Sequence, residues 1–347
     1  MTLYPPSHPS AEARALIETL LAPIGFERFV AEYYEQKPLH LPGAAERGRR
    51  LIDMATLEGV LRQPNLPRDF LTLRPDRFNA TRQARGEAPL PVEGFRDRLL
   101  DDPALLDAYI ADGHPIAGDM LTYVTPETAR TGHALAQMFE AELWCNLYYT
   151  GPSGSPFAPH FDHHEVLLVQ CEGEKDWHIY EKRVKRPLDL PEMAEALARV
   201  AEEQRAEAVA GPAMRFTARP GDVVYIPRGQ FHDAASPRGR SLHVNFSFRQ
   251  TSGVDVARAL ARLCMIDPEC RAYLPISHRD PDGRAFAAAL RHVIARLGAL
   301  VENEKLGADL THLRDARVSR SGGPPEAWDG YGLDREATMA PGRRAGS

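Results

Sequence analysis

Two segments far apart in the chain carry residue types that bind metals. The first holds His160 and Asp162, and the second ends at His232. We expect His160 and Asp162 to lie where the chain enters a strand. Because side chains alternate faces along a strand, the two would point the same way and could bind one ion. Two histidines and one carboxylate form a facial triad, which suits non-haem Fe(II) because it leaves coordination positions open.

The elements that position these residues read as short strands. Segments rich in Val, Tyr, Phe and Ile, each bounded by Gly or Pro, recur at short intervals, and this pattern indicates a barrel or jelly roll. The segments are Trp144–Tyr149, Val166–Cys171, Trp177–Tyr180, Met214–Thr217, Asp222–Ile226 and Leu242–Phe248.

Helical spacing of apolar residues occurs on both sides of the strand-rich region. It predicts helices over Ala11–Leu21, Phe26–Tyr34, Val254–Met265 and Arg284–Glu304, and the stretch Leu188–Val209 reads as a helix inserted between two strands. We therefore expect four regions. They are an N-terminal helical and loop wrapper over 1–115, a barrel over 116–250, a helical region over 251–316 and a flexible tail over 317–347.

Composition excludes several classes of protein. The 347 residues carry Lys+Arg 42 and Asp+Glu 48, which gives a net charge of -6. Proteins that bind the phosphate backbones of nucleic acids usually carry a net positive charge. No apolar run approaches the roughly 20 residues of a membrane span. The four cysteines form no CxxC pair, as expected of thiols in a reduced compartment. These features predict a cytoplasmic protein without a direct nucleic-acid or membrane partner.

The stretch from Gly221 to His232 has the spacing G-x5-P-x-G-x2-H, which resembles the second motif of the cupin barrels. Together with His160-Phe161-Asp162 it resembles the JmjC-type cupin oxygenases, in particular the ribosomal-oxygenase branch of Fe(II)- and 2-oxoglutarate-dependent peptidyl hydroxylases. The resemblance extends to Phe29–Leu39, Asn146–Thr150, Glu172–Trp177 and Ser241–His243. It implies a mainly β catalytic core, a double-stranded β-helix or jelly roll of the cupin superfamily, with an N-terminal helical wrapper and a C-terminal helical bundle.

The same resemblance implies a cosubstrate pocket. In the family a lysine beyond the metal aspartate binds the distal carboxylate of 2-oxoglutarate, and Lys175 occupies that position here. Polar residues spaced by two on predicted strands are candidates for completing the pocket, and which of the last two reaches the inner carboxylate is open. These candidates are Asn146, Tyr148, Asn245 and Ser247.

Two further residues near the triad raise alternatives. His164 occupies an offset at which related asparaginyl hydroxylases place a polar substrate contact. A fourth ligand and a rim histidine are the other interpretations of His164, and we favour substrate contact. Glu165 follows Asp162 too closely for the four-ligand cupin pattern and would face the other side of the strand.

The resemblance implies hydroxylation of an unactivated carbon on a side chain of a protein or peptide, such as a ribosomal protein or a ribosomally made precursor peptide. Fe(II), 2-oxoglutarate and O2 would be required. The alternatives are the same chemistry on a small molecule or an N-methyl group, giving a natural-product hydroxylase or a demethylase, and a metal-binding cupin without 2-oxoglutarate. The family's C-terminal helices imply a homodimer, whereas a complete winged helix is not expected in the residues that follow.

Overall fold

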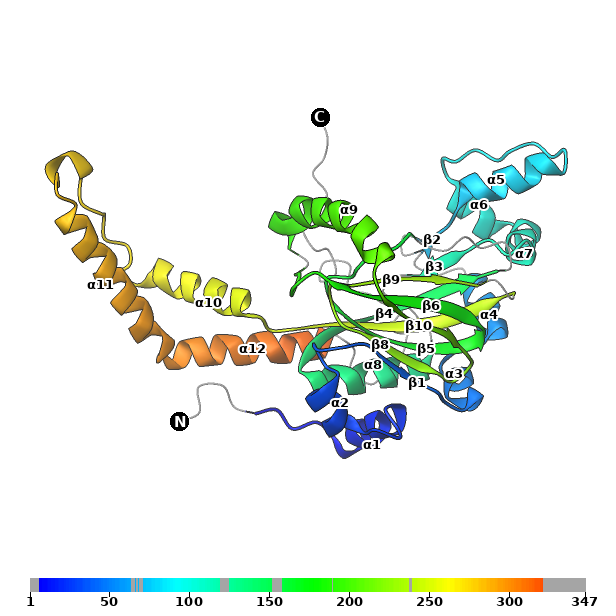
Figure 1. Ribbon diagram of the computed structural model, residues 1–347, viewed down its shortest axis with the longest axis horizontal. Coiled ribbons are helices and arrows are strands. Elements are labelled where there is room, and N and C mark those ends of the chain that lie inside the picture. Colours follow the sequence, from blue (N-terminus) through cyan, green and yellow to red (C-terminus); the bar gives the residue numbers. More distant parts are fainter. Residues whose placement is uncertain are drawn as a thin grey trace.

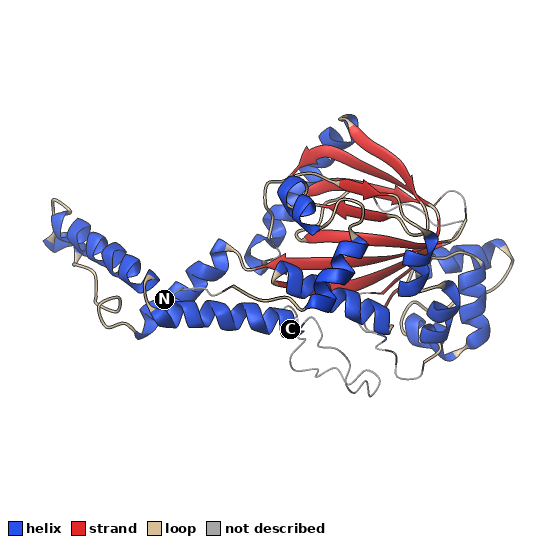
Figure 2. Cartoon of the chain, turned by 90° about the horizontal axis from the view of Figure 1, so that it is seen from below, coloured by secondary structure: helices blue, strands red, loops and turns tan. Residues whose placement is uncertain are grey.

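The computed structural model describes residues 6–63, 66, 68, 71–118, 125–151, 158–188, 190–236 and 239–320. Strands form the main body, and three helices near the C-terminal end of the described chain extend from it as an arm (Figure 1). The view from below shows the same arm reaching away from the strands (Figure 2).

The described strands form two antiparallel sheets. The larger sheet has seven strands in the order β1-β8-β5-β10-β4-β3-β2, and the smaller sheet has three in the order β7-β6-β9. Their bounds are β1 Leu39–Leu41, β2 Leu71–Thr72, β3 Ile116–Gly118, β4 Ala141–Thr150, β5 Glu165–Gly173, β6 Lys175–Arg183, β7 Ala213–Ala218, β8 Val223–Ile226, β9 Gln230–Ala235 and β10 Ser241–Gln250.

Helices precede, interrupt and follow the strands. Their bounds are α1 Ala11–Leu20, α2 Phe26–Glu32, α3 Ala45–Leu51, α4 Met54–Leu61, α5 Pro75–Ala84, α6 Phe95–Asp101, α7 Pro103–Ala111, α8 Pro126–Phe139, α9 Ala194–Ala210, α10 Gly253–Ile266, α11 Arg284–Val301 and α12 Glu304–Arg320, with short 3-10 turns η2 Pro191–Met193 and η3 Ser277–Arg279. Helices α1 and α8 lie on one side of the strands, and α9 lies on the other (Figure 1).

Each face of the larger sheet is buried against a different layer. Along β5, Leu167 and Val169 belong to the core shared with the helices. Val166 and Leu168 alternate with them and pack against Trp177 of the smaller sheet. Because strand side chains alternate faces, this pattern places one face of the larger sheet inside a barrel closed by the smaller sheet.

Local sequence explains why α8 begins where it does. The side chain of Thr125 accepts a hydrogen bond from the Thr128 N–H at 3.1 Å, and the Thr128 hydroxyl accepts one from the Thr125 N–H at 3.0 Å. Pro126 then occupies the first helical turn, where its missing N–H costs nothing. The helix packs along α1 and β4 and so supports the sheet from its outer face.

The arm consists of α10, α11 and α12. Ser252 and Asp255 form a capping box at the start of α10, and a small core of Ala259, Leu263, Leu300 and Leu306 joins the three helices. Helix α12 returns to the body and contacts β4.

The structure confirms the predicted fold class, and each predicted strand segment falls in or overlaps a strand. Four further strands were missed. Strands β1, β2 and β3 lie in segments too short to show a pattern, and β9 follows the Pro227–Gly229 bend so closely that it was read as part of that bend.

Helix α12 was also missed, and it continues through Arg320, beyond the position where the sequence predicted a tail. Residues 321–347 lie outside the described residues. None of the described helices is long and apolar enough to cross a membrane. All four cysteines are free thiols, and the cytoplasmic location stays a prediction.

Candidate metal centre

Backbone pairing joins the two histidines of the predicted triad. His160 and His232 form an isolated antiparallel bridge, in which the His232 N–H donates to the His160 carbonyl at 2.8 Å and the reverse bond is 3.1 Å. His232 lies on β9, opposite Ile179 of β6. The smaller sheet therefore fixes the position of both histidines.

The prediction that His160 and Asp162 enter a strand is wrong, because β5 begins only at Glu165. A loop hydrogen bond positions Asp162 instead, with its carbonyl accepting from the Gly229 N–H at 2.7 Å. Gly229 has a φ of +80°, and a Cβ there would lie 2.0 Å from the Val184 carbonyl oxygen. Only glycine fits this position, which gives the motif's second glycine a physical reason.

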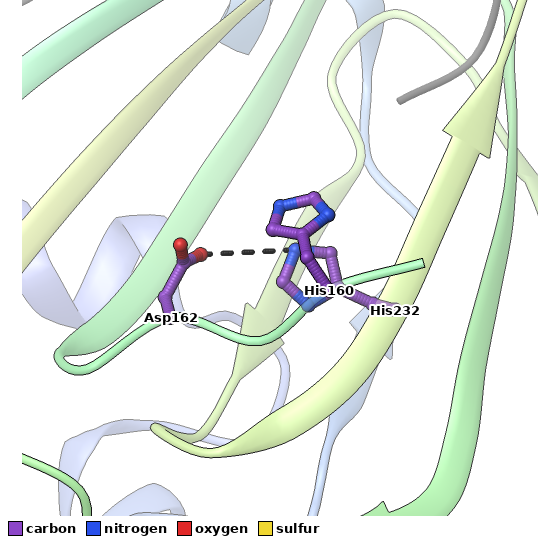
Figure 3. Close-up of side chains that lie close together, drawn as sticks. All are labelled: His160, Asp162 and His232. Carbon is purple, nitrogen blue, oxygen red and sulfur yellow. Dashed lines mark ion pairs between the residues drawn. The ribbon is translucent and has the colours of Figure 1, made fainter. Parts of the chain in front are cut away.

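The three side chains converge (Figure 3). One donor atom from each of His160, Asp162 and His232 lies within 4.8 Å of the others, and His232 Nε2 is 3.7 Å from Asp162 Oδ2. The Nδ1 atoms of the histidines lie 2.9 and 3.0 Å from the carbonyls of Ala158 and Gln230. Such contacts hold the proton on Nδ1 and leave Nε2 as the metal ligand, as is usual around protein-bound metals.

The charge states of the triad suit metal binding, which requires deprotonated ligands. Burial alone would raise the pKa of Asp162, but the nearby histidines, with His164 foremost, hold it below its usual value. Burial, with a smaller contribution from His160, lowers the pKa of His232 to about 4. Near neutral pH the site thus offers a carboxylate and a neutral imidazole.

Glu165 is not part of this group. Its side chain is on the other face of the sheet, where it accepts a hydrogen bond from the Tyr225 hydroxyl and lies 3.6 Å from Arg228 Nε. The structure therefore offers no four-ligand arrangement through Glu165.

Lys175 lies at the start of β6 and is 2% exposed. Its ammonium is 5.9 Å from the centre of the Trp177 ring, and no described residue forms a hydrogen bond or ion pair with it. Burial lowers its pKa to about 7. Because a buried cation without a partner is costly, this lysine fits a site that an anion completes.

The predicted pocket residues lie on adjacent strands of the barrel interior. In the register of β4 and β10, Asn146 pairs with Asn245 and Trp144 pairs with Ser247, while Tyr148 pairs with His243. Ser247 is also opposite Val166, near the start of β5 and so near the triad, and His243 is opposite Gln170, toward the other end. The pairs form three levels between the metal end and the inner end of the barrel.

Several polar atoms in this interior have no hydrogen-bond partner among the described residues. They are Trp177 Nε1, His243 Nδ1, Asn245 Oδ1 and Ser247 Oγ. Buried polar groups are normally paired, so several unpaired groups in the same barrel interior as a buried lysine indicate that a ligand completes the site. A polar, negatively charged ligand such as 2-oxoglutarate fits both the charge and the orphaned atoms.

The structure places His164 beside the triad. Its ring is 4.9 Å from that of Trp144 in an edge-on arrangement, and its Nδ1 is 3.4 Å from the Glu165 carbonyl oxygen. It is half-buried. A substrate contact by His164 stays a prediction.

Sequence reasoning assigned no role to His243, although the residue alternates with Asn245 and Ser247 on the last strand. That period of two was the available signal. The structure places His243 at the inner level, beside Tyr148, with ring centres 5.1 Å apart.

Comparisons with known proteins agree with this geometry. A family model for the JmjC domain matches residues 117–256. The bifunctional lysine-specific demethylase and histidyl-hydroxylase NO66 of Aedes aegypti is 29% identical over 239 residues, which are 67% of this chain and 34% of that protein. Ribosomal oxygenase 2 of Bos taurus is 28% identical over 244 residues, 68% of this chain and 48% of that protein.

The chain thus spans between about a third and a half of the length of these curated relatives. Among solved structures, YcfD, a ribosomal oxygenase from Escherichia coli in complex with cobalt and 2-oxoglutarate, covers 80% of this chain and 67% of its own at 15% identity, with a TM-score of 0.47. Residues 117–256 thus match the JmjC domain, and over about two thirds of its length the chain is similar in sequence to the ribosomal oxygenases.

Proposed function

We propose that this protein is an Fe(II)- and 2-oxoglutarate-dependent oxygenase that hydroxylates an unactivated carbon on an amino-acid side chain of a protein or peptide. The observation that carries the proposal is the buried, unpaired Lys175 in the same barrel as the His160, Asp162 and His232 triad. A metal-binding cupin that does not use 2-oxoglutarate has no evident need for a buried cation at that position.

The residues of this chain have separate tasks in such a reaction. His160, Asp162 and His232 would hold the iron, and Lys175 would bind the distal carboxylate of 2-oxoglutarate. When bound, iron and 2-oxoglutarate supply the oxidising chemistry in which O2 and a C–H bond yield a C–OH group, succinate and CO2. A set of two histidines and one carboxylate would leave coordination positions of the iron open for the cosubstrate.

The barrel also limits the access of water. Apolar side chains line the interior between the sheets, among them Val166, Leu168, Ile179 and Val224. Exclusion of water strengthens the interaction of Lys175 with a carboxylate and protects a strong oxidant from side reactions.

The substrate class rests on similarity. One relative is named a lysine-specific demethylase and histidyl-hydroxylase, and the other a ribosomal oxygenase. The first of these names refers to amino-acid residues, which supports a protein or peptide substrate. A net charge of -6 suits a basic partner but is too small to choose one.

An anaerobic titration tests the activity. Fe(II) and 2-oxoglutarate added together should produce a visible metal-to-ligand charge-transfer band in the wild-type protein, and the band should be missing in Asp162→Ala. Candidate peptides incubated with the loaded enzyme in air should then gain one oxygen by mass spectrometry. A wild-type protein that binds Fe(II) but develops no band on addition of 2-oxoglutarate would contradict the proposal.

We further propose that the arm forms a homodimer with the arm of a second copy. In the described part of the chain, exposed large apolar side chains concentrate in this arm, and Phe286, Leu290 and Ile294 form one stripe along α11. A groove of about 520 Å³ between α10 and α12, with Leu263, Ile266 and Leu313 among its lining, lies in the same arm. Exposed apolar stripes such as the one along α11 are typical of an interface.

Light scattering after size-exclusion chromatography tests the dimer. The wild type should have a mass twice that of the 38.5 kDa chain, and Leu290→Asp should have the monomer mass. Val92→Asp serves as the control, since Val92 is exposed and lies outside the arm. A wild-type monomer would rule out the proposed interface.

A further inference from the structure

The inner end of the barrel carries a second basic residue beside Lys175. His243 lies on β10, is 2% exposed, and faces the same interior as Asn245 and Ser247. It packs edge-on against Trp177 with ring centres 5.7 Å apart, and Lys175 lies over the same indole at 5.9 Å. The two basic side chains therefore meet around one aromatic ring.

Neither side chain has an acidic partner. The groups that surround His243 are Tyr148 from β4, Gln170 from β5, and Lys175 and Trp177 from β6. No carboxylate of the described residues is among them. Burial and the neighbouring charge of Lys175 both lower the pKa of His243, so this residue is held as a neutral imidazole in the absence of a ligand.

A neutral imidazole still has one N–H to donate, and the Nδ1 atom of His243 has no partner. An isolated buried donor of this kind loses a hydrogen bond to water without a replacement. A carboxylate placed between Lys175 and His243 would satisfy both groups.

The position of His243 along the strand separates it from the other candidates. Ser247 pairs with Trp144 and lies at the metal end, and Asn245 lies one level further in. His243 pairs with Tyr148 at the inner end, which is where the Lys175 ammonium lies. A ligand chelated at the triad would extend toward the inner end of the barrel, so its distal carboxylate would lie at the level of His243.

We propose that His243 and Lys175 together form the subsite for the distal carboxylate of 2-oxoglutarate, with His243 donating a hydrogen bond from Nδ1. This inference rests on the proposed function. On this proposal neither Asn245 nor Ser247 contacts the distal carboxylate. His243 is a cosubstrate-binding residue and has no contact with the triad.

Calorimetric titration of the anaerobic Fe(II) protein with 2-oxoglutarate tests the proposal by comparing the affinities of the wild type and two His243 variants. His243→Leu removes the donor, and His243→Gln keeps one. A charge-assisted hydrogen bond corresponds to a loss of about tenfold to a hundredfold in affinity. We expect a loss in this range for the Leu variant and a loss of less than about threefold for the Gln variant. If His243 only fills space, the apolar Leu variant would bind at least as well as the Gln variant, and that result would overturn the proposal.

A ligand without the distal carboxylate provides the second arm. In 2-oxopentanoate a methyl group replaces that carboxylate, so His243→Leu should leave its affinity unchanged while that of 2-oxoglutarate falls. Ser247→Ala, at the metal end of the same strand, should not discriminate between the two ligands. An equal loss of both ligands in His243→Leu would contradict a distal role.

Controls separate this inference from the proposed function. Fe(II) affinity should be the same in wild type and both His243 variants, and thermal unfolding shows whether each variant is folded. If the wild type does not bind 2-oxoglutarate, the proposed function fails. If the wild type binds it and both His243 variants bind equally well, only the role of His243 fails.

Discussion

The two faces of the larger sheet bury polar side chains in different ways. On the outer face, Tyr225 donates to Glu165 and accepts from the Glu35 N–H at 2.8 Å. Arg228 pairs with the Glu35 carboxylate and lies 3.6 Å from Glu165. Each of these groups has at least one partner within the protein, and Glu165 Oε1, which accepts no hydrogen bond, still lies 3.6 Å from the Arg228 guanidinium.

The inner face lines the barrel interior, where His243 of β10 and Lys175 of the facing strand β6 are buried at a similar depth, together with atoms of Asn245 and Ser247 that have no hydrogen-bond partner among the described residues. The outer network needs no ligand, because its charged groups have partners of opposite charge in the folded protein. Burial of Lys175 and His243 costs free energy of folding unless a ligand is bound. The charged groups of the outer face therefore lie beside partners from the protein itself, whereas Lys175 has no hydrogen-bond or ion-pair partner among the described residues.

The largest effect should come from the inner face. Asp162→Ala removes one of three metal ligands, and we expect a loss of more than about a hundredfold in Fe(II) affinity, since even residues that only orient ligands contribute tenfold to a hundredfold. Glu165→Gln, an outer-face carboxylate nearby, should leave Fe(II) affinity within about twofold. Succinate formation by Asp162→Ala at the wild-type rate would show that the triad is wrongly assigned.

The outer face should respond in stability. Arg228→Met leaves the carboxylates of Glu35 and Glu165 without their cation, and because the Arg228–Glu35 pair is half-buried we expect a loss of about 1 to 3 kcal/mol. Urea unfolding measures this loss. Arg199→Met is the matched control, because the Arg199–Glu203 pair is exposed and should contribute less than about 1 kcal/mol. An equally small effect at Arg228 would remove the contrast between the faces.

The outer network also predicts a dependence of stability on pH. Burial raises the pKa of Glu165 from 4.5 to about 7. A raised carboxyl pKa means that the folded state binds the proton more tightly, so stability falls as pH rises from about 4.5 to about 7. We expect about 2 to 3 kcal/mol of this fall to disappear in Glu165→Gln, as measured by urea unfolding at pH 5 and pH 8. A variant whose fall matches that of the wild type would place the titration elsewhere.

A smaller pH effect should appear in binding at the inner face. Burial lowers the pKa of Lys175 to about 7, and a bound carboxylate favours its charged form. Above pH 7 binding must then take up a proton, so the Kd for 2-oxoglutarate should rise by up to about tenfold per pH unit. The Kd for 2-oxopentanoate should rise less, because that ligand has no distal carboxylate. Equal slopes for both ligands would mean that Lys175 does not titrate with binding.

Sequence predicted the barrel and the triad because both depend on local patterns. The period-two segments identified most strands, and the Gly221–His232 spacing reflects a turn that only Gly229 can make. The residues that face each other across strands were harder to predict. The pairing of His160 with β9 and the meeting of Lys175 and His243 around Trp177 depend on contacts between segments distant in sequence.

The conformation of the loop that carries His160 and Asp162 was also not predicted. His160 and Asp162 converge through hydrogen bonds to His232 and Gly229, and not through strand alternation. The sequence thus predicted that these residues converge, but for a different physical reason from the one that the structure shows.

The most direct test of the contrast between the faces is a paired measurement on Lys175→Met. This substitution replaces an unpaired buried amine with an apolar side chain of similar length. We predict that the metal-free variant is more stable than wild type at pH 7, by about 1 to 3 kcal/mol in urea unfolding, and that the Fe(II)-loaded variant loses more than about tenfold in 2-oxoglutarate affinity. A variant that is less stable and binds 2-oxoglutarate as the wild type does would contradict the account.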